Sequence, residues 1–163
     1  MKIRKTRYED LPELEKIYAD ARKFMAEHGN PYQWGDTRPE RKVILQDIET
    51  GSSYICEYHG ETAVVFTLKD GPDLSYSVID EGKWLNEDPY GVIHRIASTH
   101  KVTGAAAYCI RYALEKYGNI RIDTHKENHI MQKLLENLEF TYCGIIYVED
   151  GSSRMAYQKS IPR

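Results

Sequence analysis

A strand that turns directly into a helix is the sequence feature that most constrains the fold of this chain. Residues 93–107, IHRIASTHKVTGAAA, hold the end of a predicted strand, a turn with Lys101 and Gly104, and a helix that opens with alanines. The first turn of a helix has unpaired N–H groups and the positive end of the helix dipole, so it can bind an anion such as a pyrophosphate. Small residues let a phosphate approach the backbone, and Lys101 adds a positive charge. The same residues also suit close packing of a helix on a strand, and the segment alone leaves both readings open.

Predicted strands and helices alternate along the chain. Helices are predicted from Asp10 to Gly29, from Pro39 to Gly51, from Gly104 to Gly118 and over residues 127–138. Strands are predicted over residues 2–6, 54–58, 62–68, 74–79, 91–98, 120–124, 140–148 and 155–159. This order of elements predicts an α+β fold in which helices pack on a mixed sheet.

Length and composition narrow the class of protein. A chain of 163 residues fits one domain, residues 1–163, and it has no apolar run long enough for a membrane helix. Its first residues, MKIRKTRYEDLPEL, lack the apolar stretch that is typical of a signal peptide. We therefore expect a cytoplasmic protein that does not bind membranes. The net charge of −3 gives no support to a nucleic-acid partner. The three cysteines form no CxxC pair and the six histidines no HExxH motif, so we expect no metal ion.

Three stretches of sequence carry a resemblance to one family. Residues 101–106, KVTGAA, are similar to a Gln/Arg-x-x-Gly-x-Gly/Ala loop, and Asn128 with the helix that ends in LEF at 138–140 is similar to an Asn…Leu-Tyr-Glu-x-x-Gly-Phe segment. These motifs and the opening IRKT at 3–6 resemble the GCN5-related N-acetyltransferase (GNAT) superfamily, over nearly the whole chain. The resemblance implies the GNAT architecture, a mixed and mostly antiparallel central sheet flanked by helices.

The resemblance implies an enzyme, an N-acetyltransferase, and a cofactor, acetyl-CoA or another acyl-CoA. In the family, a strand backbone binds the pantetheine arm, loop amides bind the pyrophosphate, and the Asn at the next helix start contacts the arm. Carried over to this sequence, the cofactor-binding residues are Ile96, Ala97, Ser98, Lys101, Val102, Thr103, Gly104, Ala105, Ala106 and Asn128. An extended arm can add to a free strand edge, so the physical chemistry agrees.

The implied reaction needs a group that removes a proton from the acceptor amine. His94 is the leading catalytic candidate because histidine titrates near neutral pH, although it can equally be a hydrogen-bonded strand residue. Arg95 is expected on the opposite face of the strand, so only one of the two should face the cleft. Asp123 and His125 either form an oriented pair or lie as polar residues at the rim.

One residue of the family pattern is missing. Leu135 stands where many members carry a tyrosine that protonates the departing thiolate, and leucine cannot donate a proton. In the family layout Tyr108, Tyr142 and Cys143 are candidate substitutes, or the thiolate leaves without a dedicated acid. The missing tyrosine also motivates an alternative function, a catalytically degenerate acyl-CoA-binding sensor or regulatory domain.

Large aromatic residues on polar loops suggest where the acceptor binds. In the family layout the wall positions of that pocket are Tyr32, Gln33, Trp34, Tyr76, Trp84 and Tyr90. Aromatic walls attract a cationic amine, but the same rings can simply anchor loops. We expect a primary amine of a small molecule, an amino-acid-like metabolite or a protein N-terminus to attack the acyl group directly. A homodimer is common in the family, and the rival reading outside it is a small interaction or nucleic-acid-binding module.

Overall fold

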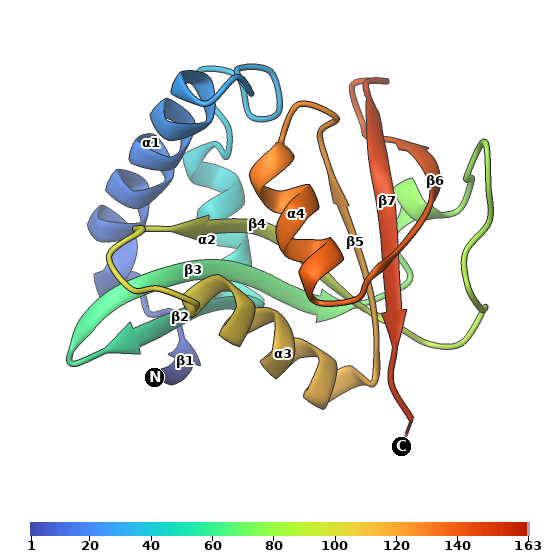
Figure 1. Ribbon diagram of the computed structural model, residues 1–163. Helices are drawn as coiled ribbons and strands as arrows, with labels where there is room; N and C mark the ends of the chain where they lie inside the picture. The colour runs from blue at the N-terminus through green and yellow to red at the C-terminus, as the bar shows by residue number, and fades with distance from the viewer. Residues whose placement is uncertain (163) are drawn as a thin grey trace.

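A mixed sheet of seven strands runs through residues 1–162, the part of the chain that the computed structural model describes (Figure 1). The strand order is β1-β2-β3-β4-β5-β7-β6, and β4 and β5 form the one parallel pair in this range. The strands are β1 (Lys2–Lys5), β2 (Ser53–Tyr58), β3 (Glu61–Asp70), β4 (Gly91–Ser98), β5 (Asn119–Thr124), β6 (Thr141–Tyr147) and β7 (Ser153–Ser160). The predicted α+β class with a mostly antiparallel sheet is confirmed.

Helices cover both faces of this sheet, and all four predicted helices are present. They are α1 (Leu11–Glu27), α2 (Arg41–Glu49), α3 (Ala105–Tyr117) and α4 (His129–Asn137), with a 3₁₀ turn, η1 (Tyr8–Asp10), before α1. Figure 1 shows α3 and α4 in front of the sheet and α1 and α2 behind it. Within residues 1–162 no helix has the length and apolar character needed to cross a membrane.

The prediction of a strand over residues 74–79 is wrong. The chain forms a 3₁₀ turn there, η2 (Leu74–Tyr76), followed by a single bridge between Asp80 and Ile145. The reason is local, because the side chain of Asp73 accepts a hydrogen bond from the backbone N–H of Ser75 at 2.9 Å and caps the turn. The segment between β3 and β4 therefore crosses one face of the sheet as a loop.

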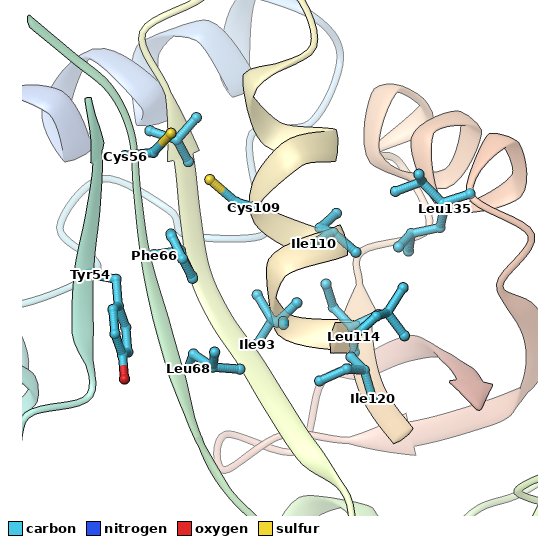
Figure 2. Close-up of a cluster of buried hydrophobic side chains, with 14 of the residues drawn as sticks. Tyr54, Cys56, Phe66, Leu68, Ile93, Cys109, Ile110, Leu114, Ile120 and Leu135 are labelled. Atoms are coloured by element: carbon cyan, nitrogen blue, oxygen red, sulfur yellow. The ribbon is translucent and has the colours of Figure 1, made fainter. Parts of the chain in front are cut away.

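The largest core lies between the sheet and helices α3 and α4. In Figure 2 the side chains of Phe66 and Ile93 from the sheet and Ile110 and Leu114 from α3 point toward one another, and Leu135 of α4 completes the cluster. Leu135 is 0% exposed, so the position at which the family motif has tyrosine is here a core position. The regular apolar spacing of α3 and α4 is thus explained by packing on the sheet.

Replacing Leu135 with alanine should cost about 2–5 kcal/mol of unfolding free energy, because it removes buried methyl groups and leaves a cavity. Urea unfolding followed by circular dichroism measures the loss. The matched control is Leu74→Ala at a leucine that is 88% exposed, for which we expect a change of about 0.5 kcal/mol or less. Equal effects of the two substitutions would contradict the packing described here.

The sheet opens at its centre, between β4 and β5. These strands pair at Gly91 with Ile120 and at Val92 with Arg121, and no further pair joins them within the described residues. Beyond Val92 the two strands diverge, so the last residues of β4 have a free edge toward β5. A free edge of this kind leaves backbone N–H and C=O groups available to an extended ligand.

A β-bulge in β4 lies beside this opening. Thr67 pairs with His94 and Val65 with Ala97, so one residue of β3 faces two of β4, and Arg95 has a φ of +50°. The bulge is held by the carboxylate of Asp47, which accepts hydrogen bonds from Arg95 Nε at 2.8 Å and Nη2 at 2.9 Å. Because the bulge breaks the alternation of side chains, His94 and Arg95 line the same cavity. The prediction that only one of them faces the cleft is wrong.

Candidate active site

Two adjoining cavities open where β4 and β5 diverge. The first, which we call the α4 cavity, measures about 240 Å³ and lies between the end of β4, the end of α1 and the start of α4. The second, the central cavity, measures about 600 Å³ and lies between β4, β5, the 30–43 segment and the β6–β7 turn. Met25, Ile96, Asn128 and Met131 line both cavities, so the two meet at this boundary.

The turn from β4 into α3 presents free backbone amides. Gly104 precedes the helix with a φ of +79°, a conformation that favours glycine, and a Cβ placed there would meet nothing within 4 Å. Five amides of the turn and the first helical turn have no hydrogen-bond partner among residues 1–162, those of Val102, Thr103, Gly104, Ala106 and Ala107. Open space beside unpaired N–H groups can accept an anion.

The predicted cofactor residues divide into two groups. Those that line the α4 cavity are Ile96, Ala97, Ser98, Ala106 and Asn128. Ala105 is instead buried in the core, and Lys101, Val102 and Thr103 line two further surface cavities, of about 760 and 620 Å³. The cavity of about 760 Å³, which Lys101 lines, shares Ser98 and His100 with the α4 cavity and so adjoins it. For Val102, Thr103 and Gly104, the free backbone amides are what we assign to the candidate anion site.

Gln33 joins the loop after α1 to the start of α4. Its Oε1 accepts hydrogen bonds from the side-chain amides of Asn30 and Asn128, each at 3.0 Å, and its backbone oxygen accepts one from Arg154 Nη2 at 3.1 Å. Asn128 also caps α4 by accepting a hydrogen bond from the N–H of Met131 at 3.1 Å. The Asn128 side chain thus fixes the border between the two cavities.

A histidine–carboxylate pair faces the central cavity. His94 Nε2 lies 2.7 Å from Asp73 Oδ2, and the hydrogen bond from His94 is the main reason that the pKa of Asp73 lies below its usual range. Asp73 is itself held in place because its N–H donates to the hydroxyl of Tyr90 at 2.9 Å. A carboxylate that holds one ring nitrogen orients the imidazole so that the other nitrogen can take a proton.

Asp123 and His125 do not form the oriented pair that was one of the two expectations. Asp123 Oδ2 accepts a hydrogen bond from the Tyr76 hydroxyl at 2.6 Å, whereas His125 Nδ1 accepts one from the N–H of Glu127 at 3.0 Å. Burial raises the pKa of Tyr76 well above its usual value, and the negative charge of Asp123 raises it further. Tyr76 therefore stays protonated and donates to the carboxylate of Asp123, which lines the central cavity.

The expected aromatic wall is only partly present. Trp34 lines the central cavity with its ring edge-on to Tyr18, whereas Tyr32 is 72% exposed and lines neither cavity. Tyr76 and Trp84 belong to the 71–90 segment, and their side chains are buried between this segment and the sheet. The Arg121 guanidinium lies 4.2 Å from the centre of the Trp84 ring and 4.1 Å from the centre of the Tyr90 ring. These three rings anchor the segment and support the site from behind.

The candidate substitutes for the missing tyrosine lie away from both cavities. Tyr108 donates a hydrogen bond to the backbone oxygen of Met1, Tyr142 packs against Tyr157 at the surface, and Cys143 is buried under the 71–90 segment. Of the α4 residues that line the α4 cavity, Ile130, Met131 and Leu134 carry no exchangeable proton, and His129, exposed in the first turn of the helix, is the one that does. No three His, Cys, Asp or Glu side chains in residues 1–162 gather closely enough to hold a metal ion.

Two functional candidates had no local sequence signal. Asp73 follows a Gly-Pro turn and Arg154 follows the β6–β7 turn, and both patterns are typical of ordinary surface loops. Both residues reach the central cavity only because the chain folds back over the sheet. Comparison of related sequences at these two positions is the signal that would have found them.

Solved structures share this fold. A GNAT family acetyltransferase from Streptococcus agalactiae 2603 is 31% identical to this chain with a TM-score of 0.90, and the match covers 99% of this chain and 96% of the other. A GNAT family acetyltransferase from Listeria monocytogenes 4b F2365 is 20% identical with a TM-score of 0.72, covering 98% and 94%. The protein yncA from Salmonella typhimurium, solved with its cofactor acetyl-CoA, is 13% identical with a TM-score of 0.64, covering 99% and 94%.

Comparisons of sequence alone find no family model and no curated protein that matches this chain. The Streptococcus agalactiae structure is nevertheless similar over almost the full length of both chains, in sequence as well as in fold. This chain belongs to the GNAT family of acetyltransferases. The more distant neighbours establish the shared fold only.

Proposed function

We propose that this protein is an N-acetyltransferase that moves an acetyl group, or another acyl group, from acyl-CoA to a primary amine. The acceptor is a small molecule, an amino-acid-like metabolite or a protein N-terminus. The observation that carries the proposal is the meeting of two cavities at Ile96, with free amides at the outer end of one and the Asp73–His94 pair in the other. Family membership makes acyl-CoA the expected donor.

The residues present fit an acyl-CoA. The free amides of the β4–α3 turn suit its diphosphate, and the mainly apolar α4 cavity suits its extended arm. Asn30 adds a specific match, because it is 3% exposed, lines this cavity, and its Oδ1 has no hydrogen-bond partner among residues 1–162. A buried acceptor without a partner is costly, and the amide N–H groups of the arm would satisfy it.

The chain's own residues then have separate tasks. When bound, the acyl-CoA would supply a thioester carbonyl that an amine can attack, and CoA would leave as its thiolate when the C–S bond breaks, to be protonated by solvent. His94 takes a proton from the acceptor nitrogen, and Asp73 holds the imidazole and stabilises its charged form. Backbone N–H groups of β4 beside the bulge, where β5 no longer pairs, are the proposed donors to the oxygen on which negative charge develops. Met25, Ile96 and Met131 exclude water at the boundary.

Release of free CoA thiol in the presence of an amine panel tests this function. The panel contains polyamines, amino acids, aminoglycosides and short peptides with free N-termini, each with saturating acetyl-CoA. We expect turnover above the hydrolysis background with at least one acceptor. Binding of acetyl-CoA without turnover on any amine would overturn the enzyme reading in favour of the sensor that the missing tyrosine at Leu135 suggests.

A further inference from the structure

The central cavity contains a buried arginine that forms no direct ion pair with the residues that the structure describes. Arg154 of β7 is 6% exposed and lines the cavity. Its Nη1 donates to Ser152 Oγ at 3.1 Å and to the oxygen of Ser153 at 2.8 Å, and its Nη2 donates to the oxygen of Gln33 at 3.1 Å. All three acceptors are neutral. The Nε–H and one of the two Nη2–H groups remain without a partner among residues 1–162. An Nε–H and an Nη2–H can together bind one carboxylate along an edge of the guanidinium.

Other cations that line this cavity are paired. Arg95 is bound by Asp47, Arg38 by Asp150 at 2.9 Å, and Lys42 lies 3.6 Å from Glu40. Arg154 forms no direct ion pair among residues 1–162. Burial lowers its pKa from the ordinary value, and the charges of Asp123 and Asp150, which lie beyond ion-pair distance, offset part of this effect. A buried guanidinium with a free edge is suited to a planar anion such as a carboxylate, which it binds through two parallel hydrogen bonds.

The opposite charge lies on the same face of the sheet. Asp123 pairs with Ala156 across the β5–β7 register, so its side chain and that of Arg154, two residues before Ala156, share a face. Besides Glu40 and Asp150, which pair with Lys42 and Arg38, the acidic residues that line the cavity are Asp73, Asp123 and Glu149, and none of them forms a direct ion pair with Arg154. The cavity therefore presents a positive group and a negative region to one ligand.

We propose that the acceptor is a free α-amino acid or a close analogue, with its carboxylate bound by Arg154 and its amine directed to His94. The inference rests on the proposed function, because it names the substrate of the same site. The apolar part of the wall, which includes Trp34, Val43 and Val148, is available to the substrate side chain. A peptide N-terminus has no adjacent carboxylate, so the proposal separates amino acids from proteins as acceptors.

Rates with matched acids and amides test the inference on the unmodified enzyme. The standard L-amino acids are compared with their α-carboxamides, which keep the amine and side chain but lose the negative charge. We expect kcat/KM for the best amino acid to exceed that of its carboxamide by about 30- to 100-fold, the effect of a charged hydrogen-bonded pair. The amine of the carboxamide loses its proton more readily, so its chemistry alone would favour the opposite order.

Variants locate the effect at Arg154. Arg154→Gln should lower kcat/KM for the amino acid by about 100-fold and for the carboxamide by less than about threefold, and Arg154→Lys should recover part of the loss. The matched control is Arg41→Gln, at an exposed arginine of α2 that pairs with Glu15 at 3.2 Å and lines neither cavity, for which we expect less than about a threefold change with either substrate. Melting temperatures and titration calorimetry with acetyl-CoA verify that each variant is folded.

Each outcome decides the inference separately from the proposed function. Equal turnover of acids and carboxamides overturns the amino-acid inference and leaves the acetyltransferase in place. Another outcome is that calorimetry detects binding of an amino acid, that Arg154→Gln abolishes this binding, and that no amine is turned over. This result supports the amino-acid site and overturns the proposed function. If no amino acid is bound or turned over, the inference is wrong whatever the enzyme does with other amines.

Discussion

Replacing Gly104 with glutamate should lower the affinity for acetyl-CoA by at least about 100-fold, measured by titration calorimetry. The substitution places a carboxylate beside the free amides that we assign to the diphosphate, and like charges at close range cost several kcal/mol. The fold should survive, because a Cβ at Gly104 meets nothing within 4 Å. The φ of +79° adds backbone strain of about 1–2 kcal/mol for any other residue.

Two controls separate charge from strain. Gly104→Ala carries the same strain without the carboxylate, and we expect it to weaken binding by less than about tenfold. Gly151→Glu introduces the same side chain at a glycine with a similar φ, +85°, and equally open space in the β6–β7 turn, and its affinity should match the wild type. Normal binding of acetyl-CoA by Gly104→Glu would show that the diphosphate site has been placed wrongly.

Replacing His94 with glutamine should lower kcat by about 100-fold, the lower end of what a positioned general base contributes. Glutamine can still donate a hydrogen bond to Asp73 but cannot take a proton from the amine. In the wild type Asp73 stays ionised and keeps the imidazole oriented, because the hydrogen bond from His94 lowers the pKa of Asp73.

The measurement is kcat at one pH with saturating acetyl-CoA and saturating acceptor. Asp73→Asn serves as the companion variant, since it keeps the imidazole and removes the charge that stabilises its protonated form. Its kcat should fall by about tenfold. An unchanged kcat in His94→Gln would exclude His94 as the base.

Local patterns predicted those parts of the fold that depend on local interactions. Helical spacing predicted α3 and α4 because one face of each packs on the sheet. The turn around Gly104 was predicted because a positive φ favours glycine and the helix that follows opens with alanines, and both are visible in the sequence. The 74–79 segment was mistaken for a strand because a single capping aspartate, Asp73, decides its conformation. Apolar content there could not distinguish a strand from a turn.

The acceptor site could not be predicted in the same way, since distant parts of the chain build it. The Asp73–His94 pair joins residues 21 positions apart, and the hydrogen bond from Arg154 to Gln33 spans 121 positions. The bulge at Arg95 reverses the expected side-chain alternation, and it is maintained by Asp47 from α2. Tyr76 and Trp84 were expected in the wall because they are large and lie on a loop, but burying them against the sheet is what fixes that loop.

A crystal structure with acetyl-CoA bound tests the central claim most directly. The claim is that the α4 cavity binds the cofactor arm and that the central cavity receives the amine. We predict the diphosphate at the amides of Val102 to Ala107, the arm along Ile96 to Ser98, and the acetyl group at the boundary with the central cavity, next to Ile96 and Met131. Acetyl-CoA bound elsewhere, or an acetyl group with no access to the central cavity, would contradict it.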